Sequence, residues 1–192
     1  MRKIISSIAG AALAAVSFGC FTDQEASTAH IPCVDGVDPA KYAGEWFEIA
    51  RLPHRFERGM TDVKANYELR TDGRINVINS GEKDGARKEI RGIARFAGGY
   101  PPGQGELEVS FFRPFYGKYR IIHLEKDYSA AIVTSGTKDY FWILARTASL
   151  PREQLDRYLN MAAAWGFNTA ALEYPWEHAA PAEGSASARK AP

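Results

Sequence analysis

The sequence contains little cysteine and almost no excess of either charge. Two cysteines among 192 residues exclude a small domain held together by disulfides and a cysteine-rich zinc module. Lys and Arg together number 24 against 23 for Asp and Glu, which leaves a net charge of +1. Proteins that bind nucleic acid through its phosphates carry a basic surplus. We therefore expect a single globular domain that does not bind nucleic acid.

Long hydrophobic runs are missing as well, and the longest one lies at the N-terminus. Residues 4–18 are apolar or small and uncharged, and they follow Arg2 and Lys3. This run is too short for a bilayer-spanning helix of about 20 residues, but it is typical of a secretory signal peptide. It ends at Gly19-Cys20, which resembles the processing site of bacterial lipoproteins, with Cys20 as the lipidated first residue of the mature chain.

The residue after Cys20 indicates which membrane a lipoprotein of this kind is sent to. Phe21 follows Cys20, and the absence of Asp at this position favours the outer membrane, with the protein on its periplasmic face. Several acyl chains on one cysteine are enough for stable anchoring. The alternative is ordinary signal cleavage nearby, which leaves a soluble periplasmic protein with Cys20 removed or paired with Cys33.

Composition divides the chain into four parts. Residues 1–19 are the predicted signal peptide, and residues 20–34 are a lipidated cysteine followed by a polar tether. Residues 35–177 are the predicted folded domain. Residues 178–192, rich in Ala, Pro and Ser, are predicted to be a disordered tail.

Motifs of the common enzyme and metal sites are absent. The sequence has no His-Glu-x-x-His, Cys-x-x-Cys, Gly-x-Ser-x-Gly or phosphate-binding glycine loop. The histidines, too far apart for a local metal motif, are His30, His54, His123 and His178. Glu48 is a candidate for a buried carboxyl group with a raised pKa, but such a group is more often hydrogen-bonded and inert. We expect no catalytic activity, metal or cofactor.

Aromatic residues, in contrast, are abundant, with ten Phe, nine Tyr and four Trp. Together with β-branched residues they form eight short runs, at residues 45–52, 62–70, 74–80, 87–97, 105–112, 117–125, 129–135 and 140–146. Most of the runs are separated by a few turn residues, too few for a crossover helix. Consecutive strands are therefore expected to pair antiparallel.

The second and fourth runs alternate between apolar and charged or polar residues. Their apolar positions are Val63, Ala65, Tyr67, Leu69, Ile90, Ala94 and Phe96. Gly92 interrupts the fourth run and predicts a bend or bulge. A sheet of eight such strands buries its apolar face by closing into a barrel, which also removes its edges.

One helix is expected after the strands. Ser149-Leu150-Pro151 is typical of a helix start, and Gly166 of a helix end. Between them, one apolar stripe is formed by Leu155, Tyr158, Leu159, Ala162 and Ala163. The predicted fold is therefore all-β, an eight-stranded antiparallel up-and-down β-barrel with one C-terminal α-helix packed outside it.

Three short motifs around these strands resemble the lipocalin family. Gly44-Glu45-Trp46 opens the first strand, Asp139-Tyr140 precedes the last strand, and Arg146 ends it. Longer stretches are similar to the bacterial outer-membrane lipocalins and their apolipoprotein D-like relatives, at residues 46–51, 54–59, 76–79, 109–117 and 139–147. The resemblance covers residues 36–176, the whole predicted domain.

The resemblance implies a barrel that binds and stores or transports a fatty acid or (lyso)phospholipid, for outer-membrane maintenance or stress response. It also implies that Trp46 closes the barrel floor with Arg146 stacked across its indole ring, a structural cation–π pair rather than a ligand contact. The alternatives are another hydrophobic cargo, such as haem, a quinone or a terpenoid, and a structural envelope lipoprotein whose barrel is filled by its own aromatic side chains. The protein is expected to be a monomer or homodimer.

Residues expected to line a cavity face inward in the alternation or belong to the aromatic runs near the mouth. They are Ala65, Tyr67, Ile90, Phe96, Phe111, Tyr116, Tyr119 and Trp142. The same side chains would fill the core of a closed barrel. A charged loop with His54, Arg55, Glu57 and Arg58 follows the first strand, where lipocalins place a long loop over the cavity. It is either a site for an anionic head group or a solvated loop held by internal ion pairs.

Overall fold

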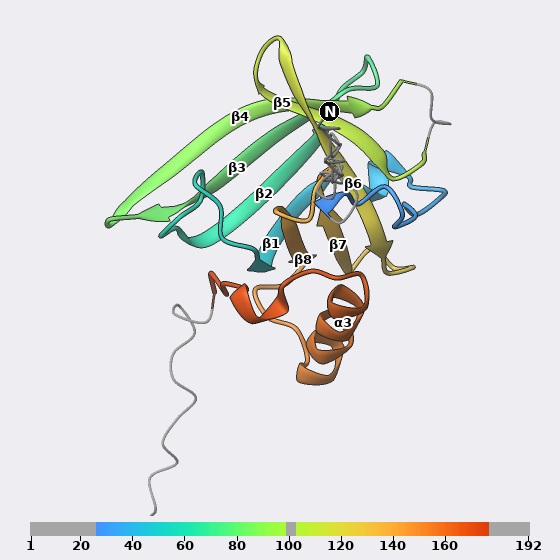
Figure 1. Ribbon diagram of the computed structural model, residues 1–192. Coiled ribbons are helices and arrows are strands. Elements are labelled where there is room, and N and C mark those ends of the chain that lie inside the picture. Colours follow the sequence, from blue (N-terminus) through green and yellow to red (C-terminus); the bar gives the residue numbers. More distant parts are fainter. Residues whose placement is uncertain (1–25, 99–102, 177–192) are drawn as a thin grey trace, which may run out of the picture.

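The computed structural model describes residues 26–98 and 103–176. These residues form a closed barrel in which each strand pairs antiparallel with its neighbours in sequence and β1 pairs with β8 (Figure 1). The strands are β1 (Gly44–Arg51), β2 (Thr61–Leu69), β3 (Ile75–Lys83), β4 (Ala86–Phe96), β5 (Glu106–Phe112), β6 (Phe115–Leu124), β7 (Ala130–Thr134) and β8 (Phe141–Ala145). The predicted fold class is confirmed. The predicted signal peptide, Cys20 and the predicted tail lie outside the described residues.

The hairpin of β3 and β4 is longer than the sequence pattern predicts. β3 was expected to end at residue 80 but continues to Lys83. Asp84 and Gly85 then reverse the chain with φ angles of 53° and 71°, which is the backbone that a two-residue hairpin turn requires.

Gly92 does not form the predicted bulge. β3 and β4 pair in unbroken register from Ile75 opposite Ala94 to Lys83 opposite Ala86. A Cβ atom at Gly92 would lie 2.7 Å from the ring of Phe111, a distance that real contacts do not reach. The glycine therefore lets Phe111 pack directly against the backbone of β4.

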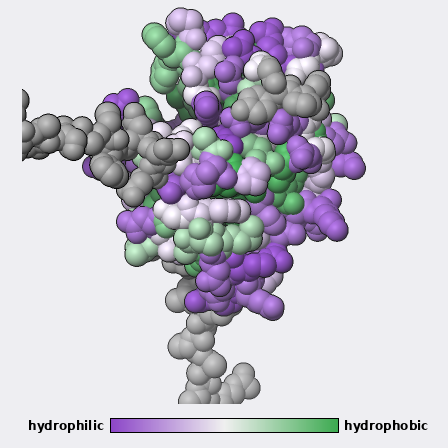
Figure 2. All heavy atoms as spheres, turned by 45° about the vertical axis from the view of Figure 1, so that its right-hand side comes forward, coloured by the Kyte–Doolittle hydropathy of each residue, from purple (hydrophilic) through white to green (hydrophobic). Residues whose placement is uncertain are grey.

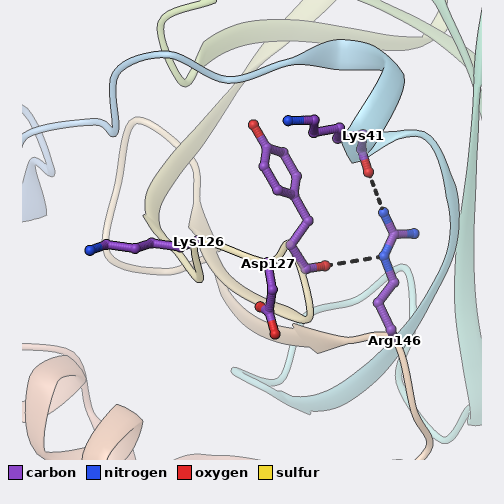
Figure 3. Close-up of a pocket in the computed structure, with 5 residues that line it drawn as sticks. Lys41, Lys126, Asp127 and Arg146 are labelled. Atoms are coloured by element: carbon purple, nitrogen blue, oxygen red, sulfur yellow. Dashed lines mark hydrogen bonds between the residues drawn. The ribbon is translucent and has the colours of Figure 1, made fainter.

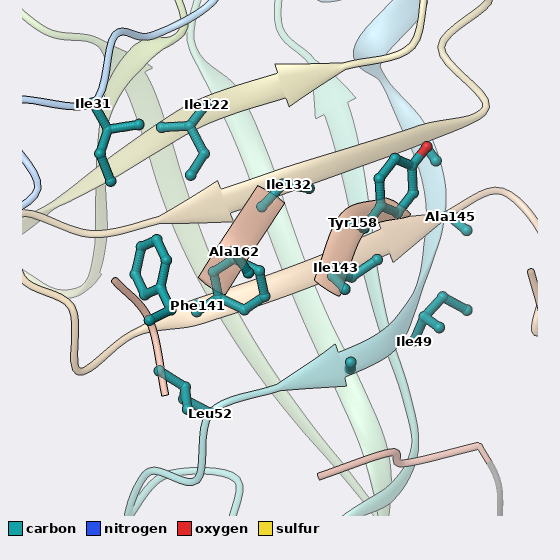
Figure 4. Packing of buried hydrophobic residues seen from close by; sticks show 13 residues of the cluster. Ile31, Ile49, Leu52, Ile122, Ile132, Phe141, Ile143, Ala145, Tyr158 and Ala162 are labelled. Carbon is teal, nitrogen blue, oxygen red and sulfur yellow. The ribbon is translucent and has the colours of Figure 1, made fainter. Parts of the chain in front are cut away.

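The helix α3 (Arg152–Ala164) lies on the outer face of the barrel (Figure 4). Tyr158 and Ala162 are its buried residues, and they pack with Ile132 of β7 and Ile143 of β8. Because the helix covers one face and the barrel interior the other, all five residues of β7 are buried. The predicted exterior helix is confirmed.

The details of the helix differ from prediction at two positions. Pro151 occupies the N-cap position and no side chain caps the helix, so Ser149 does not have the expected capping role. Ala163, assigned to the apolar stripe, is exposed. A short 3-10 helix, η1 (Thr169–Ala171), follows α3.

Part of the segment expected as a tether packs against the barrel. Backbone hydrogen bonds join Thr28 to Gly136 and Val34 to Ile121. Arg120 of β6 binds the segment to the barrel. Its guanidinium donates to the carbonyl oxygens of Thr28 and Ile31 and forms an ion pair with Glu106. Residues 26–34 are therefore ordered along the outside of β6, because they satisfy a buried arginine that the charge pattern does not reveal.

Cys33 lies in this packed segment and is a free thiol. Its Sγ donates to Oε2 of Glu106 at 3.0 Å. Burial, and then this hydrogen bond, raise the pKa of the Cys33 thiol to about 12. A thiol held in this way is a poor nucleophile.

The meander gives the barrel two chemically different ends. The short helix α2 (Pro39–Tyr42) lies at one end, which we call the α2 end. The opposite end, here the mouth end, carries loops 52–60, 84–85, 113–114 and 135–140 (Figure 1). Hydrophilic residues cover most of the face seen in Figure 2, and hydrophobic residues are concentrated in its middle.

Candidate ligand-binding site in the barrel

The inner face of the barrel is mostly apolar, and several of its side chains are only partly buried. Register places small residues opposite larger ones: Ala65 lies beside Trp46, and Ala94 lies beside Val109. Val109 and Tyr119 belong to the interior cluster but are only partly buried. Side chains that point inward and still contact solvent define an accessible inner wall.

Most of the predicted lining residues are brought together. Six of them belong to the interior cluster: Ala65, Tyr67, Phe96, Phe111, Tyr119 and Trp142. The alternation in β2 and β4 therefore predicted correctly which face of these strands points into the barrel. Their roles in ligand binding stay predictions.

Two predicted lining residues lie elsewhere. The guanidinium of Arg95 lies 4.2 Å from the ring centre of Tyr116. Arg95 also pairs with Glu108 on the charged outer face, so Tyr116 is a surface residue rather than part of the wall. Ile90 has the inward register opposite Asn79, but it is 39% exposed because the long β3–β4 hairpin carries it to the rim.

Three tyrosine hydroxyl groups meet inside the barrel near the α2 end. The hydroxyl of Tyr119 lies 2.7 Å from that of Tyr42 and 3.0 Å from that of Tyr67. Burial raises the pKa of Tyr67 to about 12 and raises those of Tyr42 and Tyr119 well above the usual value. All three phenols therefore stay neutral and act as hydrogen-bonding groups.

The predicted pair of Trp46 and Arg146 closes the α2 end. The guanidinium of Arg146 lies 3.8 Å from the centre of the Trp46 ring, and the indole N–H donates to the Tyr42 carbonyl. Arg146 also donates to the carbonyl oxygens of Lys41, Ala43 and Glu45. A Cβ atom at Gly44, whose φ is +96°, would lie 3.3 Å from this guanidinium. The glycine of the first family motif therefore leaves room for Arg146 beside the Trp46 ring.

A hollow of about 420 Å³ lies outside this closure, lined by Lys41, Lys126, Asp127, Tyr128 and Arg146 (Figure 3). Arg146 donates to the carbonyl oxygens of Lys41 and Tyr128 there. With charged side chains around it and its arginine occupied by backbone oxygens, the hollow does not suit an apolar chain.

A buried ion pair lies at the mouth end. Nη1 of Arg51 is 2.8 Å from Oε1 of Glu48, and both side chains are almost fully buried. In a regular strand residues three apart face opposite sides. The register of β1 against β8 shifts between Glu48 and Ala50, and this bulge turns both charged side chains to the same side.

Arg51 also fastens the loop over the mouth. Its Nη2 donates to the carbonyl oxygens of Glu57 at 2.8 Å and Met60 at 3.1 Å. The same guanidinium pairs with Glu173, which lies beyond η1. One arginine thus joins the first strand, the 52–60 loop and the C-terminal segment.

The 52–60 loop divides into an inner and an outer part. Nε2 of His54 lies 2.8 Å from Oε2 of Glu57, and the indole N–H of Trp142 donates to the same oxygen at 3.4 Å. Arg55 and Arg58 are exposed. The predicted contact within the loop is present, and the loop forms an aromatic and polar cover over the mouth rather than a solvated loop.

The two glutamates of the mouth have opposite pKa shifts. Burial, followed by the neighbouring carboxylate of Glu57, raises the pKa of Glu48 well above its usual value, despite the opposing charge of Arg51. Burial would also raise the pKa of Glu57, but its hydrogen bond to His54 and the charges nearby outweigh this effect and lower it. Glu48 is thus the protonatable carboxyl group of the mouth and Glu57 the ionised one.

Several buried polar atoms have no hydrogen-bond partner among the described residues. They are both ring nitrogens of His54, Oδ1 of Asp62, Oδ1 of Asn79 and Oγ of Ser110. Asn79 lies opposite Ala65 and is on the inner face. In the sequence, Asn79 and Arg51 stand out only as parts of the family-like stretches 76–79 and 46–51, and neither was predicted to belong to a site. The i, i+3 spacing of Glu48 and Arg51 hides their pairing unless the bulge is known.

The second family motif also lies at the mouth. Tyr140 stacks on Trp142 with ring centres 5.9 Å apart and contacts the ring of His54 at 5.6 Å. Asp139 is exposed and accepts a hydrogen bond from the Thr137 hydroxyl.

Comparison with known proteins agrees with this architecture. Residues 37–177 match the model of the lipocalin-like domain. The chain belongs to the lipocalin family. The outer membrane lipoprotein Blc of Vibrio cholerae is 44% identical over 136 residues, which cover 69% of this chain and 78% of that protein. Blc of Escherichia coli K12 is 43% identical over 140 residues, covering 72% and 78%.

More distant lipocalins share the family and the fold. Apolipoprotein D of Macaca fascicularis is 32% identical over 140 residues, which cover 68% of this chain and 71% of that protein. Insecticyanin from Manduca sexta superposes with a TM-score of 0.64 at 19% identity, covering 76% of this chain and 83% of that one. The latter likeness concerns the fold alone.

Family membership sets the general function, and the bacterial relatives indicate the location. Lipocalins bind and transport hydrophobic ligands, and the bacterial relatives are outer membrane lipoproteins, which confirms the predicted outer-membrane localisation. None of the helices in residues 26–98 and 103–176 is long and apolar enough to cross a membrane. Within the same residues, no group of His, Cys, Asp and Glu is arranged to hold a metal ion.

Proposed function

We propose that this lipocalin binds the acyl chain of a fatty acid or (lyso)phospholipid inside its barrel, and stores or transports it for outer-membrane maintenance or stress response. Binding needs no chemical step and no cofactor. The protein is held at the membrane by lipid on Cys20, which lies outside the described residues.

The observation that carries the proposal is the accessible apolar inner wall. Val109, Phe111 and Trp142 point inward and remain partly exposed. A methylene chain that replaces water against such a wall gains about 25 cal/mol per Å² of apolar surface removed from water. A barrel filled by its own side chains would leave no inner surface in contact with solvent.

The polar groups of the mouth suit the head group of the same ligand. Asn79 and His54 each offer a buried polar atom with no partner among the described residues, and leaving such atoms unpaired is unfavourable. A hydroxyl or protonated carboxyl group brought there by a lipid would donate to Oδ1 of Asn79, and a hydroxyl group or an oxygen of the same head group would pair with Nδ1 of His54. The ligand would then lie with its chain toward Trp46 and its head group under the 52–60 loop.

Native mass spectrometry of residues 21–192, before and after addition of lysophospholipid and fatty acid, tests the proposal. We expect a one-to-one adduct for the wild type and a strongly weakened one for Trp142→Ala. Tyr116→Ala is the matched control, because it removes an aromatic ring from the outer face of the same barrel. Asn79→Leu should change the ranking of head groups without abolishing uptake.

The other outcomes are equally informative. A barrel that stays bare with every lipid offered contradicts the carrier function and supports a structural envelope lipoprotein. An adduct formed with haem, a quinone or a terpenoid but not with lipids identifies a different hydrophobic cargo. Equal losses in Trp142→Ala and Tyr116→Ala would place binding outside the barrel.

A further inference from the structure

The exposed large hydrophobic side chains gather at one end of the barrel. In the part of the chain that the structure describes, five such residues are exposed, and four of them lie at the mouth end. Phe56 is 59% exposed in the 52–60 loop, and Phe112 and Phe115, which flank the β5–β6 turn, are 67% and 76% exposed. Ile90 lies at the same rim, and Leu69 is the exception at the α2 end. Exposed apolar residues gathered in this way mark an interaction surface.

Positive charge accompanies the phenylalanines. Arg55, Arg58 and Arg113 are exposed and form no salt bridge with another described residue. The carboxylate of the 52–60 loop, Glu57, is turned inward to His54. Exposed acidic residues do occur at this end, in the β3–β4 hairpin and at Asp139. In the two loops that carry the phenylalanines, however, the exposed charged side chains are all arginines. Aromatic and arginine side chains together suit an anionic lipid surface.

The N-terminal segment begins at the same end. The carbonyl oxygen of Ala26 accepts a hydrogen bond from the backbone N–H of Lys138, and Ser27 pairs with Thr137, both in the loop between β7 and β8. Cys20 precedes Ala26 by six residues, which span at most about 20 Å when fully extended. A lipid on Cys20 therefore lies within reach of the mouth end, whereas contact by the α2 end would need a connection along the length of the barrel as well.

We infer that the mouth end docks on a phospholipid surface containing anionic lipids. Phe56, Phe112 and Phe115 enter the interface, Arg55, Arg58 and Arg113 contact lipid phosphates, and the barrel opens toward the membrane. The inference rests on the proposed function, since it assumes a lipid-binding barrel anchored through Cys20. A ligand would then pass between bilayer and barrel without crossing water.

Vesicle flotation of residues 21–192, which lack the acyl chains, tests the surface itself. Vesicles of phosphatidylcholine with added phosphatidylglycerol are compared with vesicles of phosphatidylcholine alone. We expect binding to the anionic vesicles, and a loss of about tenfold in the partition coefficient for Phe112→Ser/Phe115→Ser. Arg113→Gln should weaken binding about fivefold, and added salt should do the same.

Matched controls lie at the α2 end. Leu69→Ser removes an exposed hydrophobic residue and Lys126→Gln an exposed positive charge, and both should bind vesicles as the wild type does. The inference is overturned if the wild type ignores anionic vesicles, if the double phenylalanine variant binds as well as the wild type, or if Leu69→Ser loses as much. Circular dichroism confirms that each variant is folded.

A second readout separates this inference from the proposed function. Native mass spectrometry should show that Phe112→Ser/Phe115→Ser still takes up lipid in solution, whereas Trp142→Ala should still bind vesicles but take up little lipid. Lipid uptake without vesicle binding would overturn the docking surface alone. Vesicle binding without lipid uptake would overturn the carrier function alone.

Discussion

Each end of the barrel is held by an arginine, and the two arginines differ in burial and in partners: Arg146 at the α2 end is partly buried, and Arg51 at the mouth end is buried. At the α2 end Arg146 lies on the Trp46 ring and donates to backbone carbonyl oxygens, which are neutral. At the mouth end Arg51 contacts the carboxylate of Glu48, and Glu57 lies close enough to influence both. The α2 end is closed by packing and by hydrogen bonds from one cation to uncharged acceptors. The other is a charged cluster whose members depend on one another and on pH.

The largest expected effect on stability is at the closure of the α2 end. Trp46 is fully buried, and Trp46→Ala should lower the free energy of unfolding by about 3–5 kcal/mol, because the ring leaves a cavity and Arg146 loses its stacking partner. Denaturant unfolding followed by circular dichroism measures the loss. Trp142→Ala, at the mouth end, should lower the free energy of unfolding clearly less, because Trp142 is only partly buried. Equal losses would mean that the mouth is packed as tightly as the floor.

Removing the arginine of the charged cluster should come next. Arg51→Met leaves the buried carboxyl group of Glu48 and two loop carbonyl oxygens without their partner, and we expect a loss of about 3 kcal/mol in the free energy of unfolding. The double variant Arg51→Met/Glu48→Leu should recover part of the loss, since no unpaired carboxyl group then remains. A single variant as stable as the wild type would show that the cluster is solvated.

Acid should lower the free energy of unfolding by protonating Glu57 at the mouth end. The folded protein holds the pKa of Glu57 below its ordinary value of 4.5. The ionised group therefore contributes stability above about pH 4.5, and this contribution is lost as the pH falls through the lower folded value. Denaturant unfolding between pH 3 and 6 should show a smaller acid-induced loss for Glu57→Gln than for the wild type. Parallel curves for the two proteins would contradict the ionised assignment.

The smallest effects are expected at exposed hydrophobic residues of either end. Phe115→Ser and Leu69→Ser should each change the free energy of unfolding by less than about 0.5 kcal/mol, because neither side chain is buried. A loss above about 1 kcal/mol at Phe115 would show that its ring packs against the barrel in solution and is not available to a membrane.

Regular features were predictable because they follow the backbone period. The alternation of Ala65 and Tyr67 with charged residues predicts which face of β2 is buried, and the structure places both in the interior cluster. Tyr116 shows where this reasoning fails. The interruptions of the register between β5 and β6 and the neighbouring Arg95 decide its direction, and neither is visible in the pattern of one strand.

The candidate site was predictable only in its apolar part. Trp142 shares a face with Leu144, which indicates an inward ring, and the structure agrees. The polar part arises from the bulge after Glu48 and from a loop that folds back over the mouth. Such contacts join residues far apart in sequence, as between Glu57 and Trp142, and local periodicity carries no information about them.

The pattern of residues along the chain was enough to predict the barrel, its strand order and its exterior helix, because period-two alternation, short turns and one apolar helical stripe leave an eight-stranded meander few ways to bury its surface. It also determined the family, through motifs that the Trp46 and Arg146 stack explains. Three features are visible only in the folded chain: the charges buried at the mouth, the packing of residues 26–34 on the barrel, and the exposed end shared by Phe56, Phe112 and Phe115. Those features depend on which loops a closed sheet brings together, and this is fixed by register and not by the residues of any one segment.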